Sequence, residues 1–205
     1  NIYGKSALFT GDSIGWGSDQ RAWAARIGEK YAMTYVNASV SGASVSTTRD
    51  YRMIEQLEAN KTGSFDYVIM HGPTNDAWDE VNVGTLSESY NVANYDVATY
   101  AGALEELFYY ARKYFPDAQL GYIINFRFSS TLNNGLSDMS AYVEMAKQVC
   151  NKWSVPYLDL YNNEELTAAL KVGTTVYLPD NVPVCLATVI LLPGSSMHRD
   201  SCRSG

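Results

Sequence analysis

The chain has 205 residues and a formal net charge of −7 at pH 7, with 46% hydrophobic and 18% charged residues. Its length suits one domain with a substantial core. The acidic balance argues against nucleic acid and anionic membranes as partners, because both are bound through clustered Lys and Arg. The longest apolar run, residues 185–193, is shorter than the about 20 residues of a membrane-spanning helix. We expect no membrane span, and two locations stay open: the cytoplasm, or secretion with the signal peptide already removed.

Strands and helices are predicted to alternate along the chain. In chain order we expect a strand at 5–10, a helix at 21–33, a strand at 34–37, a helix around Ile54 and Leu57, a strand at 67–70, a helix at 100–115, a strand at 120–126, a helix around Cys150 and a strand at 156–160. Such alternation implies a parallel sheet with helices on both faces. The predicted class is therefore α/β.

The three cysteines, Cys150, Cys185 and Cys202, lack the paired spacing of a zinc site or a disulfide framework. Cys150 falls on the apolar face of its predicted helix, so we expect a buried free thiol there. Nothing in the sequence implies a metal ion or an organic cofactor.

Polar turns that contain glycine follow three of the predicted strands, and each carries one candidate residue. These are Ser13, Gly42 and Asn75. Each has a plain structural explanation: a helix N-cap or turn serine, a turn glycine with positive φ, and a turn asparagine bonded to its own backbone. Sites in open parallel sheets form beyond the carboxyl ends of the strands. Together the three suit acyl transfer, which needs a nucleophile beside donors for the oxyanion.

Three blocks of the chain together resemble the SGNH, or GDSL-type, hydrolase family. They are Gly11-Asp12-Ser13, Gly42 in "VSGAS", and Gly72-Pro-Thr-Asn-Asp76. The resemblance extends from about Lys5 to Asp180. It implies a three-layer αβα sandwich of flavodoxin-like type around a central parallel sheet. Pro73 departs from the family pattern, which usually has glycine there.

The resemblance also implies the roles of the site residues. Ser13 would be the nucleophile. Its backbone N–H, the Gly42 N–H and the Asn75 side chain would form the oxyanion hole. Asp180 would orient a catalytic histidine three residues later, but Pro183 occupies that position. Because a serine hydroxyl needs a nearby base and proline cannot supply one, we expect impaired hydrolysis.

Two histidines are present elsewhere in the chain. His71, at the end of the third predicted strand, is expected to be a partly buried residue bonded to backbone. His198 lies 18 residues after Asp180 in a polar segment, and it remains a candidate base for Ser13.

We divide the chain into a hydrolase-like domain at residues 1–182 and an atypical C-terminal tail at residues 183–205. We hypothesise that the tail is read in a shifted frame or derives from cloning. His-Pro encoded CAC-CCG before T reads as Pro-Val two bases later, and Pro183-Val184 stand here. The alternative is a genuine tail in which Val184, Ala187, Ile190 and Leu191 pack as a terminal helix or strand.

The predicted function is that of a serine ester hydrolase acting on small acyl or carbohydrate esters. An alternative is a non-catalytic glycan- or ligand-binding module on the same fold, with Trp16 and Trp78 gripping the glycan. A third interpretation, a flavodoxin- or receiver-like domain that uses Asp12, leaves Gly42 and Asn75 without a role.

Overall fold

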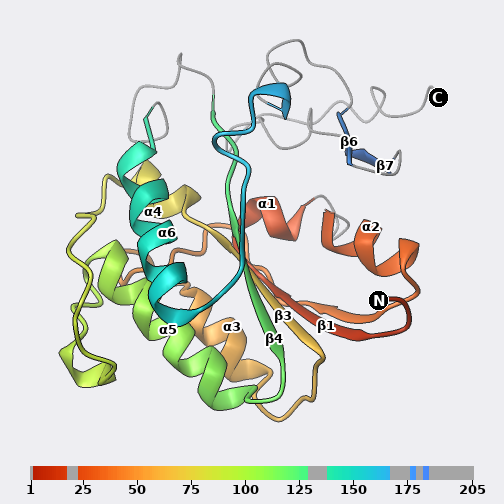
Figure 1. The fold of residues 1–205 in the computed structure, drawn as a ribbon, viewed down its shortest axis with the longest axis horizontal. Coiled ribbons are helices and arrows are strands. Elements are labelled where there is room, and N and C mark those ends of the chain that lie inside the picture. Colours follow the sequence, from red (N-terminus) through yellow and green to blue (C-terminus); the bar gives the residue numbers. More distant parts are fainter. Residues whose placement is uncertain (1, 18–22, 129–137, 167–175, 179–181, 185–205) are drawn as a thin grey trace.

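The computed structural model describes residues 2–17, 23–128, 138–166, 176–178 and 182–184. Five parallel strands form one sheet in the order β2-β1-β3-β4-β5 (Figure 1). The strands are β1 (Ser6–Thr10), β2 (Thr34–Asn37), β3 (Tyr67–Gly72), β4 (Gln119–Ile124) and β5 (Tyr157–Asp159). The central position of the first strand brings its carboxyl end between those of β2 and β3.

Helices lie on both faces of the sheet (Figure 1). One face carries α3 (Met53–Ala59), α5 (Tyr100–Tyr114) and α6 (Ser140–Trp153), and the other carries α2 (Trp23–Lys30). The predicted three-layer α/β architecture is therefore confirmed. The remaining elements are short: α1 (Ser13–Trp16), α4 (Thr74–Trp78), the 3-10 helix η2 (Val92–Asn94), and an antiparallel hairpin of β6 (Val176–Leu178) and β7 (Val182–Val184).

The main core lies between the sheet and the layer of α3, α5 and α6. The predicted apolar face of the 100–115 helix is buried there, with Leu104, Leu107, Phe108 and Ala111 at most 1% exposed. Cys150 is a buried free thiol, as predicted, and burial raises the pKa of that thiol to about 12. A second cluster on the opposite face packs Phe9 against α2.

Several predicted boundaries were wrong. The helix expected to reach residue 33 ends at Lys30, because Ala32 takes a left-handed backbone with φ of +48°. The third strand continues to Gly72, and the fourth ends at Ile124 rather than at Phe126. The two short helices α1 and α4 directly follow β1 and β3, where only turns were expected.

Candidate active site

The turn after β1 is held firmly and leaves Ser13 facing outward. Gln56 clamps the backbone of Gly11 from both sides, with the Gly11 N–H donating to Oε1 and Nε2 donating to the carbonyl, each at 2.8 Å. The buried carboxylate of Asp12 accepts from Ile14 N at 2.8 Å and is the N-cap of α1. Ser13 is thus the first helical residue and not the cap, so the N-cap explanation of this serine was wrong. Its side chain is exposed.

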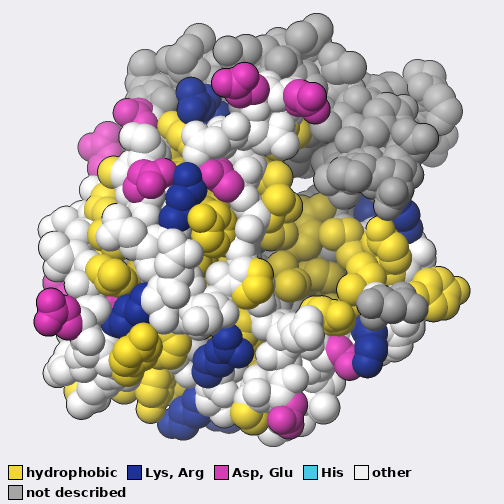
Figure 2. All heavy atoms as spheres, viewed as in Figure 1, with side chains coloured by type: hydrophobic (Ala, Val, Ile, Leu, Met, Phe, Trp, Pro, Cys, Tyr) yellow, Lys and Arg dark blue, Asp and Glu magenta, His cyan; other side chains and the backbone are white. Residues whose placement is uncertain are grey.

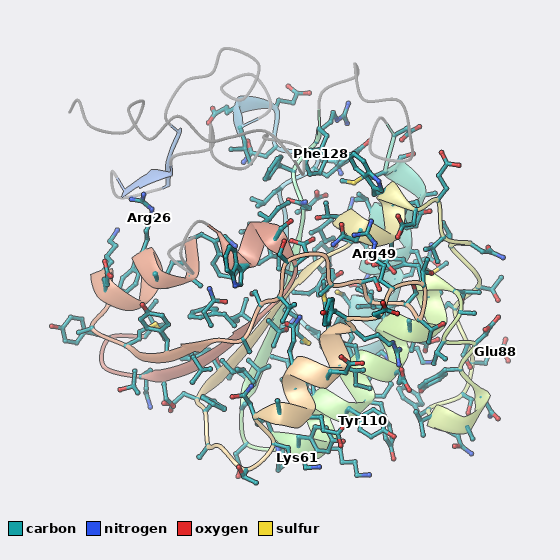
Figure 3. All side chains as sticks on the ribbon, turned by 180° about the vertical axis from the view of Figure 1, so that it is seen from behind. Arg26, Arg49, Lys61, Glu88, Tyr110 and Phe128 are labelled. Atoms are coloured by element: carbon teal, nitrogen blue, oxygen red, sulfur yellow. The ribbon has the colours of Figure 1, made fainter. Side chains whose placement is uncertain are left out.

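The loop after β2 carries Gly42 in a left-handed conformation. Its φ is +85°, so the expectation of a positive-φ turn glycine is confirmed. Arg49 Nη1 donates to the Gly42 carbonyl at 3.4 Å, and the same guanidinium forms two bonds with Asp79, of 2.5 and 2.8 Å. Asp79 follows α4, so this ion pair connects the second strand-end loop to the third. Figure 3 shows Arg49 above Tyr110 and Lys61 and below Phe128.

The loop after β3 forms α4, and two of its side chains hold the Gly42 loop. Asn75 Nδ2 donates to the carbonyl of Ala43 at 2.7 Å. The fully buried Asp76 accepts from Val45 N at 2.8 Å and from Ser46 N at 2.9 Å. Burial raises the pKa of Asp76, and the hydrogen bonds from Val45 and Ser46 lower it in part. Asn75 therefore bonds across to the neighbouring loop, and the expected bond to its own backbone was wrong.

Several hydrogen-bond donors in these turns have no acceptor among the residues that the structure describes, and three of them are the groups predicted to form the oxyanion hole. The first two are the backbone N–H groups of Ser13 and Gly42. The third is the second hydrogen of the Asn75 amide, because an amide nitrogen has two and only one is directed at Ala43. Since β2, β1 and β3 are adjacent and parallel, all three donors belong to one edge of the sheet.

His71 lies beneath the Ser13 turn. Its side chain is 1% exposed, and its Nδ1 lies 3.8 Å from Asp12 Oδ1. A Cβ atom added at Gly15 would lie 3.9 Å from that same nitrogen. Burial lowers the pKa of His71, and the Asp12 carboxylate and a hydrogen bond with Asn125 act against this. The expected partial burial was wrong, because the side chain is almost fully buried, and Nδ1 has no hydrogen-bond partner among the described residues.

Sequence reasoning did not single out the apolar residues beside Ser13. Ile14 and Phe126 are buried together and pack against Phe128, whose ring centroid lies 5.0 Å from that of Phe126. Phe128 is labelled near the top of Figure 3, above Arg49. The apolar residue directly after Ser13 was the available signal. Trp16 and Trp78, the candidate glycan contacts, are both half-buried, in α1 and α4.

The predicted acid and base partners of Ser13 lie mostly outside the residues that the structure describes. Asp180 and His198 lie outside the described residues. Pro183 is in β7, where it pairs in register with Tyr177 of β6. Within the described ranges, no group of three or more His, Cys, Asp or Glu side chains is placed to hold a metal ion. No helix in those same ranges is long and apolar enough to cross a membrane.

The sheet between two helix layers, with polar turns after three adjacent strands, defines an α/β protein of the SGNH hydrolase type. The family model of the GDSL-like lipase/acylhydrolases matches residues 18–168, which is more than half of the chain. The chain therefore belongs to the GDSL-like lipase/acylhydrolase family and is classed by family with the ester hydrolases. The matched region contains Gly42 and Asn75 and begins after Ser13. A comparison with curated proteins found no match.

Solved structures share the fold at low sequence identity. A protein from Lactobacillus plantarum is 20% identical with a TM-score of 0.72, over 93% of each chain. A GDSL-like lipase from Bacteroides ovatus is 17% identical with a TM-score of 0.56, over 82% of this chain and 96% of its own. A mutant of an acetylxylan esterase from Geobacillus stearothermophilus is 17% identical with a TM-score of 0.55, over 92% and 90%. These similarities establish the fold.

Proposed function

We propose that the chain is a serine ester hydrolase that acts on small acyl esters, including acetyl esters of carbohydrates. One observation carries the proposal. An exposed serine and three donors without an acceptor among the described residues belong to the carboxyl ends of three adjacent strands. Preorganised donors at a developing oxyanion are each worth about 10²–10³ in rate. The likeness to an acetylxylan esterase supports a carbohydrate ester as the substrate.

The proposed reaction is acyl transfer through Ser13. Its Oγ attacks the carbonyl carbon of the ester, and the carbonyl oxygen becomes an oxyanion. The N–H groups of Ser13 and Gly42 and the amide of Asn75 stabilise this negative charge. Collapse of the intermediate breaks the bond to the alcohol and leaves an acyl-serine, which water then hydrolyses.

The mechanism requires a general base that accepts the proton of the Ser13 hydroxyl. Asp180 would orient a histidine, but Pro183 stands where the family has one, and His198 is the remaining candidate. His71 is buried and faces Asp12 and Asn125. We therefore expect slow turnover, because Ser13 attacks without the general base that is worth about 10²–10⁴ in rate.

The direct test is hydrolysis of p-nitrophenyl acetate and of an acetylated xylo-oligosaccharide. We expect slow release of acetate by the chain and none above background by Ser13→Ala. Ser41→Ala is the matched control, because Ser41 is an exposed serine of the neighbouring Gly42 loop. Equal rates for the chain and Ser13→Ala would remove Ser13 from the mechanism.

A non-catalytic glycan-binding module is the second candidate, and Pro183 at the histidine position favours it. Trp16 and Trp78 would then contact the sugar from α1 and α4. Calorimetric titration with acetylated xylo-oligosaccharides separates the two functions. Binding without acetate release that is lost in Trp78→Ala and kept in Ser13→Ala would support the module.

We propose further that residues 183–205 form a tail distinct from the domain at residues 1–182, read in a shifted frame or derived from cloning. The change at Pro183 supports this, since Asp180, three residues earlier, still follows the family order. Sequencing the gene tests the idea. A single uninterrupted frame that close relatives share, tail included, would contradict it.

A further inference from the structure

Two of the donors proposed for the oxyanion hole belong to separate loops. Gly42 lies in the loop after β2, and Asn75 lies in α4 after β3. The Asn75 amide reaches the first loop at Ala43, the residue after Gly42. Donors stabilise an oxyanion only when they are held in advance within hydrogen-bond reach of it. A contact that joins Gly42 itself to α4 would therefore set how well these two donors act together.

The backbone of Gly42 is held by the side chain of Arg49. Gly42 is the third residue of a turn in which the Ala43 N–H donates to the Val40 carbonyl at 3.0 Å, and a φ of +85° suits that position. Among the described residues, the carbonyl of Gly42 has one hydrogen-bond donor, Arg49 Nη1 at 3.4 Å. A Cβ atom placed at Gly42 would lie 3.9 Å from the same nitrogen. The guanidinium therefore lies directly against the residue whose N–H is to bind the oxyanion.

The other nitrogens of the guanidinium are anchored to the helix that carries Asn75. Arg49 Nε and Nη2 donate to the two carboxylate oxygens of Asp79, at 2.5 and 2.8 Å. Asp79 is the C-cap of α4, and its N–H donates to the Asn75 carbonyl at 3.0 Å. Pairing through two nitrogens fixes the plane of the guanidinium and leaves Nη1 for Gly42. Only Arg49 and Asp79 therefore stand between one donor residue and the other.

An ordinary surface ion pair would not fix two loops in this way. Acidic and basic side chains lie next to each other at several places on the face drawn in Figure 2, and exposed pairs of this kind contribute little to stability. The pair of Arg49 and Asp79 differs in two respects. The side chains are only 28% and 23% exposed, and the guanidinium makes a further contact, to Gly42.

We propose that Arg49 is a positioning residue that fixes the donors of Gly42 and Asn75 relative to each other. Asp79 supplies its anchor on α4. Arg49 acts through the two donor residues, so its removal should lower the rate of the chemical step more than the affinity for substrate. The inference rests on the proposed ester hydrolysis, but the order of the Gly42 backbone can be measured without turnover.

Nitrogen-15 relaxation of the Gly42 amide in the full-length chain is the first test. We expect an order parameter of about 0.85 in the unmodified chain and a fall below about 0.6 in Arg49→Met. The milder Arg49→Lys should show the same fall, and it serves if Arg49→Met does not fold. Arg52→Met is the matched control, because Arg52 Nη2 also donates to a carbonyl of this loop at 3.4 Å, that of Val45, but pairs with Glu106 of α5. An unchanged order parameter in the Arg49 variants, or a low one in the unmodified chain, would overturn the proposal.

Hydrolysis of p-nitrophenyl acetate by the same variants is the second test. In Arg49→Met we expect kcat to fall about 10- to 100-fold with little change in KM, because only the arrangement of the donors is lost. Arg49→Lys should lose nearly as much, since lysine keeps the charge but cannot pair with Asp79 through two nitrogens and also reach Gly42. Arg52→Met should keep its kcat. Full activity in Arg49→Lys would contradict a positioning role.

Ser13→Ala, measured beside these variants, separates this inference from the proposed function. Equal turnover by Ser13→Ala and the unmodified chain would defeat the proposed hydrolysis, and the relaxation of the Gly42 amide would still decide the role of Arg49. Loss of turnover in Ser13→Ala with an unchanged kcat in Arg49→Met would defeat the positioning role alone.

Discussion

Asn75 Nδ2 donates a hydrogen bond to the carbonyl oxygen of Ala43 over 2.7 Å. The bond joins the loop after β3 to the loop after β2, across the carboxyl end of the strand that precedes Ser13. It uses one hydrogen of the amide and fixes the direction of the other. The side chain proposed for the oxyanion hole is thus also part of what holds the Gly42 loop in place.

Replacing Asn75 with alanine should therefore affect both activity and stability. We expect turnover of p-nitrophenyl acetate to fall about 10²–10³-fold, because an oxyanion donor is lost. Loss of the bond to Ala43 should cost about 1 kcal/mol in the free energy of unfolding. Steady-state kinetics and urea denaturation measure the two effects. Gln119→Ala, an exposed amide at the start of β4, should leave both unchanged, and a kinetic change without any loss of stability would contradict the tie between the loops.

Restoring a histidine at position 183 should increase hydrolysis. Pro183→His would recreate the family's order of Asp180, two residues and a histidine. General-base catalysis is worth about 10²–10⁴ in rate, so acetate release should rise by that factor if the position faces Ser13. Pro183→Ala removes the proline without adding a base and should remain slow. If both variants stay equally slow, position 183 does not lie beside the nucleophile.

Lys152 and Glu105 form a buried ion pair under the loop before α5. The Lys152 Nζ bonds to Glu105, which is fully buried, and donates to the carbonyls of Ser87 at 2.7 Å and Ser89 at 2.6 Å. Lys152→Met should destabilise the chain by about 3 kcal/mol, since it leaves a buried carboxylate without its partner.

A double-mutant cycle with Glu105→Gln separates the pair from its surroundings. The double variant should lose less than the sum of the two single losses, because neither charge is then left alone. Urea denaturation gives the four free energies of unfolding, for the unmodified chain, the two single variants and the double variant. Strictly additive losses would mean that the two residues stabilise the loop independently.

The buried His71 should make stability depend on pH. Burial lowers its pKa, so the folded chain keeps the imidazole neutral while the unfolded chain takes up a proton below about pH 6.5. Stability from this group is present above that pH and is lost as the pH falls, by at most about 1.4 kcal/mol per pH unit. His71→Gln should flatten the curve between pH 7 and pH 5. His198→Gln provides the comparison, and a curve unchanged by His71→Gln would contradict the assignment.

Asp66 should make the stability of the fold depend on pH in a lower range than His71 does. It accepts from Lys5 Nζ at 2.8 Å, and from the backbone N–H and the hydroxyl of Ser6 at 2.8 and 2.9 Å. These donors lower its pKa to about 2. A lowered folded pKa stabilises the chain above the unfolded value of about 3.9, and this is lost as the pH falls toward 2.

The melting temperatures of the chain and of Asp66→Asn should accordingly differ at pH 6 and converge toward pH 2. Asp50→Asn, at an exposed position before α3, should melt like the unmodified chain throughout. A difference for Asp66→Asn that stays constant over this range would show that the carboxylate charge is not what stabilises the strand start.

The long elements could be predicted because their signals are local. The strand at 34–37 was placed correctly, and the buried face of α5 follows from a repeat that continues for four turns. α1 and α4 have four and five residues, which is too short for a periodic pattern. Asp12 as the cap of α1 could have been anticipated, since aspartate before a short turn is a favoured N-cap.

The contacts that define the candidate site are all distant in sequence. Gln56 holds Gly11 from 45 residues away, and Asp76 binds Val45 and Ser46 from about 30. No pattern of residue types announces such pairs, because each depends on which strands become neighbours. The same holds for His71, whose full burial results from α2 and the Ser13 turn lying over it.

The order of residue types along the chain was sufficient for the fold class, the family and the position of Ser13, because hydrophobic period and turn chemistry act over a few residues. Only the tertiary structure decided that Asn75 and Asp76 hold the Gly42 loop, and that no described helix covers one face of the sheet over β3 to β5. These features arise when parallel strands align their carboxyl ends and bring together groups that the sequence separates by tens of residues.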